Sequence, residues 1–384
     1  EFLRPVSFYF FANRVWYLGV GSNKMKIGII LNPYGEVSPG GLARTILEWS
    51  RGMLQIDQEN QYIVFLKSSP KILPDLPGNN WRMEVLGSGI FWLNRLRGAS
   101  LADVYIFQTP VLPLFFKPKK SVIIAQDFPY LYPRVRRPGI RARLRNLIVY
   151  FYHAFSLKKA DAVIAVSDST KDDLIKNFKV PENKITVIHM GFKKICDTPE
   201  VLVALPSNFF LFTGVVKERK NVLNIAKAFG KFKKGDTNGY KLVLAGKTEG
   251  EYFMAVKKYL EEKNLSKEVI FLGFLNDGQL AHVYKRATAL LFPSLVESFG
   301  FPVLEAMDCG IPVITSNIFG PKELGGDAAI LVDPYNVDEM ARAIQKLAAD
   351  PALRDDLIKK GFLRAKKFDW KDTAQKTLKL IYSL

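Results

Sequence analysis

Two glutamates, Glu297 and Glu305, are separated by seven residues, which form a short loop and the start of an expected helix. An apolar strand is expected to end at Phe292, and Pro302 suits the first turn of the helix that follows. Backbone N–H groups at a helix N-terminus favour anions, and carboxylate oxygens accept hydrogen bonds from hydroxyl groups. The segment therefore predicts a site for a ligand that is both phosphorylated and rich in hydroxyls.

A purely structural interpretation is also open, because single acidic residues are common near the positive end of a helix. That interpretation suits Glu305 taken alone. It explains less of the whole strand, loop and helix, in which Gly300 lets the backbone approach a ligand closely.

Positive charge is expected next to a second strand end. The strand expected at 209–212 is followed by Gly214 and then by Arg219 and Lys220. Cations at the start of a helix oppose its dipole, so a structural role there is unfavourable. Fixed cations do suit a phosphate on which negative charge grows as a bond breaks.

Apolar runs that alternate with amphipathic stretches must position these residues. The strands expected from this pattern are 26–31, 62–66, 104–107, 121–125, 162–166, 185–188, 209–212, 242–245, 269–272, 289–292, 313–315 and 329–332. The helices expected between and beside them are 42–55, 141–156, 169–178, 221–232, 251–263, 302–308 and 338–348. Such alternation predicts an α/β protein with doubly wound parallel sheets, which bind ligands beyond the carboxyl ends of their strands.

The alternation pauses at 192–208 and then restarts. We expect two tandem Rossmann-like domains with a cleft between them. Their predicted bounds are 25–200 on the acceptor side and 201–368 on the nucleotide-sugar side. An N-terminal extension at 1–24 and a C-terminal helix at 369–384, packing back on the first domain, complete the predicted layout.

The segment from Glu297 to Glu305 resembles the paired-glutamate motif of the retaining glycosyltransferases of family 4 (glycosyl transferases group 1), which have the two-domain GT-B fold. The resemblance implies that Glu297 faces the donor sugar and that Glu305 binds the nucleotide ribose. Ser298, Phe299 and Gly300 would then lie against the diphosphate and the sugar.

Other segments extend the resemblance. Arg219 and Lys220 match the family's donor-phosphate element in an Arg-Lys-Asn form, with Val215 where relatives usually carry arginine. Gly40 and Gly41 match a glycine-rich loop that admits the diphosphate. Asp127 follows Gln126 where relatives commonly read His-Asp, and a glutamine cannot serve as an acid or a base.

The resemblance implies transfer of a hexose, with retention, from a nucleotide-diphosphate sugar to a glycan or lipid-linked acceptor in cell-surface polysaccharide biosynthesis. The Arg-Lys-Asn form is similar to that of bacterial mannosyltransferases and favours a GDP-mannose donor. No metal site and no cofactor are expected. Three alternatives stay open: a nucleotide-sugar epimerase, a phosphorylase on the same fold, and a non-catalytic degenerate transferase.

The charge balance predicts an anionic partner. The formal net charge is +18, and residues 1–200 carry 28 basic against 16 acidic residues. The segment 134–145 holds six arginines and is expected to meet an anionic membrane surface or a lipid diphosphate, unless it is simply a solvated helix face. Nucleic acid is disfavoured, because no recognition module accompanies the charge.

The remaining polar candidates predict little chemistry. Two cysteines, Cys196 and Cys309, are too few for a disulfide framework and fit a reduced compartment. We expect a cytoplasmic protein, peripheral on the inner face of the plasma membrane. His153 is expected in the core, His189 in a hinge loop and His282 on a helix surface.

Overall fold

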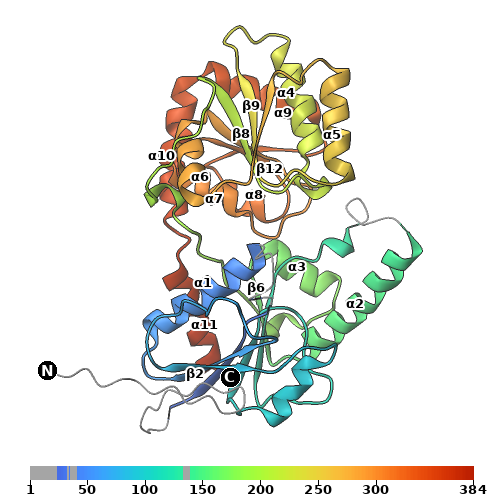
Figure 1. The fold of residues 1–384 in the computed structure, drawn as a ribbon, viewed down its shortest axis with the longest axis vertical. Coiled ribbons are helices and arrows are strands. Elements are labelled where there is room, and N and C mark those ends of the chain that lie inside the picture. Colours follow the sequence, from blue (N-terminus) through green and yellow to red (C-terminus); the bar gives the residue numbers. More distant parts are fainter. Residues whose placement is uncertain (1–23, 33, 35–40, 133–138) are drawn as a thin grey trace, which may run out of the picture.

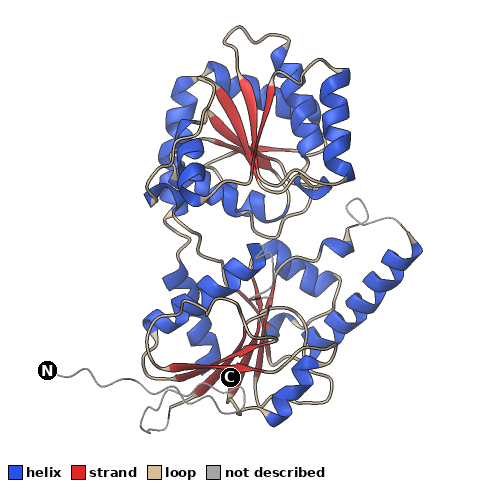
Figure 2. Cartoon of the chain, viewed as in Figure 1, coloured by secondary structure: helices blue, strands red, loops and turns tan. Residues whose placement is uncertain are grey.

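A computed structural model describes residues 24–32, 34, 41–132 and 139–384. The described chain forms two α/β domains stacked along the long axis of the molecule (Figure 1). In each domain a central sheet is flanked by helices (Figure 2). The fold confirms the predicted pair of Rossmann-like domains.

The first domain contains a seven-stranded parallel sheet in the order β3-β2-β1-β4-β5-β6-β7. Its strands are β1 (Lys26–Ile30), β2 (Gln61–Leu66), β3 (Trp81–Val85), β4 (Val104–Phe107), β5 (Ser121–Ala125), β6 (Ala162–Ala165) and β7 (Ile185–Val187). Every residue of β4, β5 and β6 is buried, as expected for strands covered on both faces.

The second domain contains a six-stranded parallel sheet in the order β10-β9-β8-β11-β12-β13. Its strands are β8 (Phe209–Thr213), β9 (Lys241–Ala245), β10 (Val269–Gly273), β11 (Ala289–Phe292), β12 (Val313–Ser316) and β13 (Ile330–Val332). The strand order reverses between β8 and β11, which is where doubly wound sheets open a crevice for a ligand.

Eleven α-helices lie in the described residues. They are α1 (Gly41–Ile56), α2 (Ile140–Lys159), α3 (Asp168–Lys176), α4 (Val222–Lys233), α5 (Glu251–Glu262), α6 (Asp277–Arg286), α7 (Phe301–Asp308), α8 (Phe319–Gly325), α9 (Val337–Ala349), α10 (Pro351–Ala365) and α11 (Trp370–Tyr382). None of the helices in the described part of the chain is both long and apolar enough to cross a bilayer.

The last helix, α11, lies in the first domain beside α1 (Figure 1). Trp49 of α1 donates a hydrogen bond from Nε1 to Thr377 Oγ1 of α11 at 3.0 Å. The Trp49 ring also packs against the ring of Trp370, with centroids 6.2 Å apart. The chain thus crosses between the domains twice, and the second crossing is anchored by the buried Trp49 and the half-buried Trp370.

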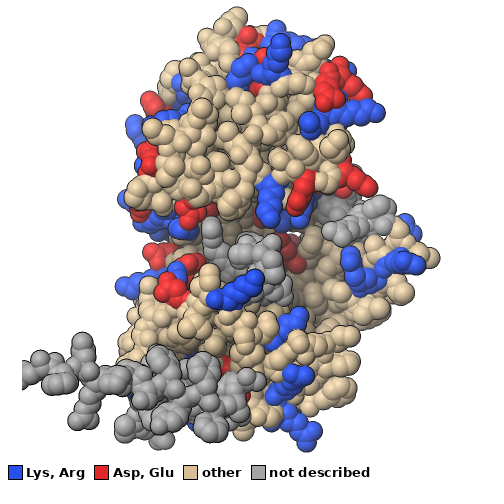
Figure 3. Space-filling view, in the orientation of Figure 1, with Lys and Arg blue, Asp and Glu red and all other residues tan. Residues whose placement is uncertain are grey.

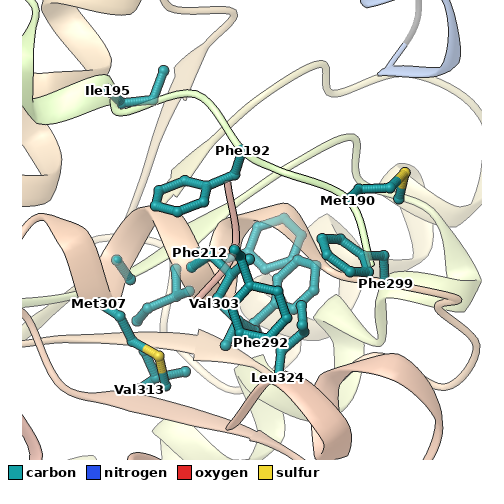
Figure 4. Packing of buried hydrophobic residues seen from close by; sticks show 14 of the residues in the cluster. Met190, Phe192, Ile195, Phe212, Phe292, Phe299, Val303, Met307, Val313 and Leu324 are labelled. Atoms are coloured by element: carbon teal, nitrogen blue, oxygen red, sulfur yellow. The ribbon is translucent and has the colours of Figure 1, made fainter. Parts of the chain in front are cut away.

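The first crossing is also packed. Met190, Phe192 and Ile195 of the connecting segment join a buried cluster that includes Phe299 and α7 side chains such as Val303 (Figure 4). Burial of this apolar surface holds the connecting segment against the helix that follows the Glu297 loop.

Three expectations need correction. The edge strand β3 was not expected, because its sequence Trp-Arg-Met-Glu-Val lacks the apolar run of a central strand. His282 was expected on the surface of a helix; it does lie on a helix, α6, but it is buried, with Nδ1 3.0 Å from Glu200 Oε2. Cys196 and Cys309 are not free thiols but form a disulfide. It joins the 3-10 turn η5 (Ile195–Asp197) to the end of α7.

Candidate functional site

The Glu297 loop links β11 to α7 at the carboxyl end of the second sheet. Gly300 is the N-cap of α7 and has a φ of 111°, a conformation that side chains with a Cβ rarely adopt. Pro302 lies in the first turn of the helix. The local sequence therefore dictates a sharp turn into α7, and this turn sets Glu297 in front of the helix.

Glu297 forms ion pairs with two cations. Lys220 Nζ contacts Glu297 Oε2, and Arg219 Nη1 lies 3.2 Å from the same oxygen. Only 12% of the Lys220 and Glu297 side chains is exposed. Burial lowers the pKa of Lys220, and the neighbouring Glu297 carboxylate opposes that shift. The Lys220 ammonium also lies 4.6 Å from the centre of the Phe292 ring, which favours the charged form.

The two cations are held by Asn221, a residue that the sequence analysis did not single out. Arg219 and Lys220 lie in the 3-10 turn η6 (Glu218–Lys220), and Asn221 follows with a φ of 64°. Its side-chain amide donates hydrogen bonds to Pro293 O at 2.9 Å and to Pro334 O at 2.6 Å. Asn tolerates this left-handed conformation better than most residues, so it fixes the turn and ties it to the loop before Glu297.

Asp127 reaches this cluster from the other domain. It follows β5, and its Oδ1 accepts a hydrogen bond from Ser298 N at 3.1 Å. Its Oδ2 lies 3.5 Å from Arg219 Nη1. The structure thus brings Asp127, Arg219, Lys220, Glu297 and Ser298 together, across the junction of the two domains.

Glu305 lies on α7, one turn beyond the loop, and does not line the same cavity. Its Oε2 accepts a hydrogen bond from Tyr284 OH at 2.9 Å, and that hydroxyl also lies 2.9 Å from Thr213 Oγ1. Tyr284 is fully buried, and burial raises its pKa well above the usual value, so it stays a neutral donor. The sequence analysis missed Tyr284, since nothing in the pattern of α6 marks it.

Three of the predicted donor-binding residues, Gly214, Gly41 and Phe299, lie at strand or helix ends or in the core near the loop. Gly214 has a φ of 132°, and a Cβ on the neighbouring Gly246 would lie 2.0 Å from Gly214 O, so both strand ends require glycine. Gly41 begins α1, whereas Gly40 lies outside the described residues. Phe299 is buried, and its ring packs on Phe301 and Phe368.

A cavity of about 350 Å³ opens where these residues meet. One wall belongs to the first domain and the other to the second. Its lining residues are Thr45, Gln108, Thr109, Pro110, Gln126, Asp127, Met190, Arg219, Lys220, Glu297, Ser298, Phe299, Phe301 and Pro302. Basic and acidic side chains gather along the junction of the domains on the face shown in Figure 3.

The histidines lie outside this cavity. His189 Nε2 contacts Glu323 Oε1, and Glu323 Oε2 accepts a hydrogen bond from Asp168 N at 2.9 Å. These contacts link the two domains. His153 bonds Tyr130 OH through Nδ1, and burial lowers its pKa to about 4. Among the described residues, no group of three or more His, Cys, Asp or Glu side chains is placed to hold a metal ion.

Two family models match the two halves of the chain. The family described as Glycosyl transferases group 1 matches residues 198–364, and Glycosyltransferase Family 4 matches residues 39–193. The chain belongs to the group 1 glycosyltransferases of family 4. The paired-glutamate loop and the Arg-Lys turn lie in the matched second half of this family 4 member.

Several relatives of this family 4 chain are named mannosyltransferases. O-antigen chain mannosyltransferase B of Escherichia coli is 27% identical over 232 residues, which cover 58% of this chain and 61% of the relative. The serotype-specific mannosyltransferase WbdA of Escherichia coli is 28% identical over 281 residues, covering 69% of this chain and 34% of the relative. This chain therefore spans less than two thirds of the length of these relatives.

Solved structures support the fold. A sucrose-phosphate synthase from Thermosynechococcus elongatus superposes with a TM-score of 0.75 at 19% identity, covering 94% of this chain and 99% of that one. Anabaena HepE, solved in complex with UDP and glucose, gives a TM-score of 0.73 at 19% identity, with 94% and 100% covered. At this identity the likeness concerns the fold alone.

Proposed function

We propose that this protein transfers a hexose from a nucleotide-diphosphate sugar to a glycan or lipid-linked acceptor, with retention of configuration. The observation that carries the proposal is the cluster of Arg219, Lys220 and Glu297 in a cavity between two Rossmann-like domains. Mannose is the preferred sugar and GDP-mannose the preferred donor. The names of the relatives support that preference, and they also support a proposed role in polysaccharide assembly.

In this proposal different site residues bind different parts of the donor. Its diphosphate lies against Arg219, Lys220 and the amides at the start of α7, which supply positive charge. Glu297 accepts hydrogen bonds from the sugar, and Glu305 accepts them from the ribose. Arriving phosphate oxygens would compete with Glu297 for the two cations, and this competition would free the Glu297 carboxylate for the sugar.

The reaction breaks the bond between the sugar C1 and the phosphate oxygen. The acceptor hydroxyl adds to C1 on the same face, and the leaving phosphate takes its proton. Negative charge grows on the phosphate as the bond breaks, so Arg219 and Lys220 stabilise the transition state more than the ground state. No cofactor or metal ion takes part in this scheme.

The products distinguish this scheme from its alternatives. With GDP-mannose and a mannoside acceptor, we expect release of GDP and an α-linked product, measured by proton NMR of the new anomeric signal. A β-linked product would contradict retention. An altered free nucleotide sugar would indicate an epimerase, release of mannose 1-phosphate a phosphorylase, and no turnover of any nucleotide sugar a non-catalytic protein.

A membrane surface is proposed as a second partner, because α2 exposes an apolar stripe. Its side chains recur at spacings of three and four residues and are between 41% and 84% exposed: Ile140, Leu144, Leu147, Ile148, Phe151 and Phe155. The helix contains no acidic residue, and Arg141 and Arg143 flank the stripe on either side. The segment 134–137, with its three other arginines, lies outside the described residues. In Figure 1, α2 runs along the outer flank of the first domain.

Vesicle binding tests this surface. We expect binding to phosphatidylcholine vesicles that contain phosphatidylglycerol. Replacing Arg141, Arg143 and Arg145 with glutamine should weaken it roughly 100-fold at low salt, at about 1 kcal/mol per cation. Replacing Leu147 and Phe151 with serine should weaken the binding that persists in high salt. Phe274→Ser, at a residue that is 74% exposed in the second domain, is the matched control. Unchanged binding in both variants would contradict the assignment.

A further inference from the structure

Two glutamine side chains lie at the ends of adjacent strands on the first-domain wall of the cavity. Gln108 follows β4 and Gln126 follows β5, and these strands pair in parallel with Phe107 opposite Ile123. This register places Gln108 beside Ile124, and Gln126 is two residues further along its strand. Since side chains alternate across a sheet, the register puts Gln108 and Gln126 on the same face. Both line the cavity that contains Arg219 and Glu297.

Each glutamine has one buried polar atom without a hydrogen-bond partner among the described residues. These atoms are Gln108 Oε1, an acceptor, and Gln126 Nε2, a donor. Gln108 is only 3% exposed, and its other amide atom, Nε2, donates to Ile46 O and Ser50 Oγ at 3.3 Å each. The orientation of Gln108 is therefore fixed by α1, which leaves Oε1 as the atom available to a ligand.

An unpaired buried donor or acceptor is costly, so such atoms indicate a group that arrives to satisfy them. The available pair is one acceptor and one donor, both uncharged. A hydroxyl group matches this pair, because it donates one hydrogen bond and accepts another. A phosphate or carboxylate oxygen would leave the Gln108 acceptor unsatisfied, and an ammonium would leave the Gln126 donor unsatisfied.

Most charged side chains of the cavity lie on the opposite wall. Arg219, Lys220 and Glu297 are on the second-domain wall, and Asp127 binds Ser298 N across the junction. The second-domain wall thus carries the charges that suit a diphosphate. The first-domain wall carries uncharged side chains that suit a neutral ring, apart from Asp127, which is paired across the junction. We propose that Gln108 and Gln126 together recognise a hydroxyl of a neutral hexose and select against uronic acids and amino sugars at that position.

This inference rests on the proposed sugar transfer and names two residues that determine specificity within it. The hexose is either that of the donor or that of the acceptor, since both rings must meet in the cavity. The hydrogen-bonding chemistry is the same for the two sources, and an experiment with two arms separates them.

The first arm measures binding by isothermal titration calorimetry with GDP and with GDP-mannose. The second arm measures binding of methyl α-mannoside to the GDP-loaded protein. The variants are Gln126→Leu and Gln108→Leu, with Gln345→Leu on the exposed face of α9 as the matched control. Because Nε2 of Gln126 makes no hydrogen bond within the described part of the protein, Gln126→Leu loses none there and is the variant expected to fold normally. Gln108→Leu also releases α1, and its melting temperature is recorded alongside.

In one arm only, we expect both variants to lose about tenfold of the binding affinity that the sugar contributes. Their affinity for GDP should equal that of the wild-type protein. A loss in the first arm assigns the donor hexose, and a loss in the second assigns the acceptor hexose. Wild-type gains in Gln126→Leu in both arms would overturn the inference, and so would a wild-type protein that binds GDP but gains nothing from sugar in either arm. A wild-type protein that binds neither GDP nor GDP-mannose would instead count against the proposed donor site.

Discussion

The Lys220→Ala substitution is expected to lower kcat for sugar transfer by about 100- to 1000-fold, the usual cost of removing one preorganised group that faces developing charge. Lys220 is the cation in closest contact with Glu297, and only 12% of its side chain is exposed. Its charge is therefore poorly screened by solvent and acts strongly on a neighbouring phosphate. Initial rates at saturating donor measure the effect.

Two controls accompany this prediction. Lys217→Ala removes an exposed lysine just before the same turn and should leave kcat unchanged. Removing one partner of a nearly buried ion pair is commonly destabilising, so the melting temperature of Lys220→Ala is measured as well. Should that variant unfold, Arg219→Ala replaces it, because Arg219, the other cation paired with Glu297, is more exposed, at 30%. A folded variant with wild-type kcat would show that Lys220 takes no part in the reaction.

The Glu305→Ala substitution is expected to raise the donor KM by about 10- to 100-fold, with little change in kcat. Hydrogen bonds to a charged group contribute roughly 1.5–3 kcal/mol each. A ribose lies away from the reacting carbon, so its contacts are alike in the ground state and the transition state, and losing them affects KM. Steady-state kinetics with varied donor concentration measure both constants.

Tyr284→Phe is the informative companion variant. It removes the hydroxyl that donates to Glu305 Oε2 but keeps the carboxylate, so we expect a smaller rise in KM than in Glu305→Ala. Glu261→Ala removes an exposed glutamate on α5 and should leave both constants unchanged. A drop in kcat at constant KM in Glu305→Ala would place Glu305 with the reacting atoms rather than with the nucleotide.

The local pattern of the sequence predicted the layers of the fold well. Parallel strands buried on both faces, such as β5 and β11, carry uninterrupted apolar runs that are easily recognised. Because β8 and β11 are neighbours in the sheet, residues that follow the two strands must meet. The convergence of Lys220 and Glu297 could therefore be expected from the order of the strands.

The sequence pattern could not predict contacts between residues that are far apart in the chain. Tyr284 is an ordinary apolar-face residue of α6 until the fold places its hydroxyl against Glu305. The hydrogen bonds of Asn221 to Pro293 and Pro334, and the pairing of Cys196 with Cys309, depend on loops whose paths no periodicity records. Gln108 carried no signal at all, because its significance lies in an atom that the surrounding protein leaves unpaired.

The most direct test of the proposed donor site is a thermal-shift measurement of the wild-type protein and Glu305→Ala with GDP-mannose, GDP, UDP-glucose and UDP. A ligand at 100 times its Kd stabilises the folded state by about 2.7 kcal/mol. We predict that GDP-mannose and GDP raise the melting temperature of the wild-type protein by several degrees and that Glu305→Ala loses most of this rise. A wild-type melting temperature that none of the four ligands changes, or an undiminished rise in Glu305→Ala, would contradict the donor site built on Glu297 and Glu305.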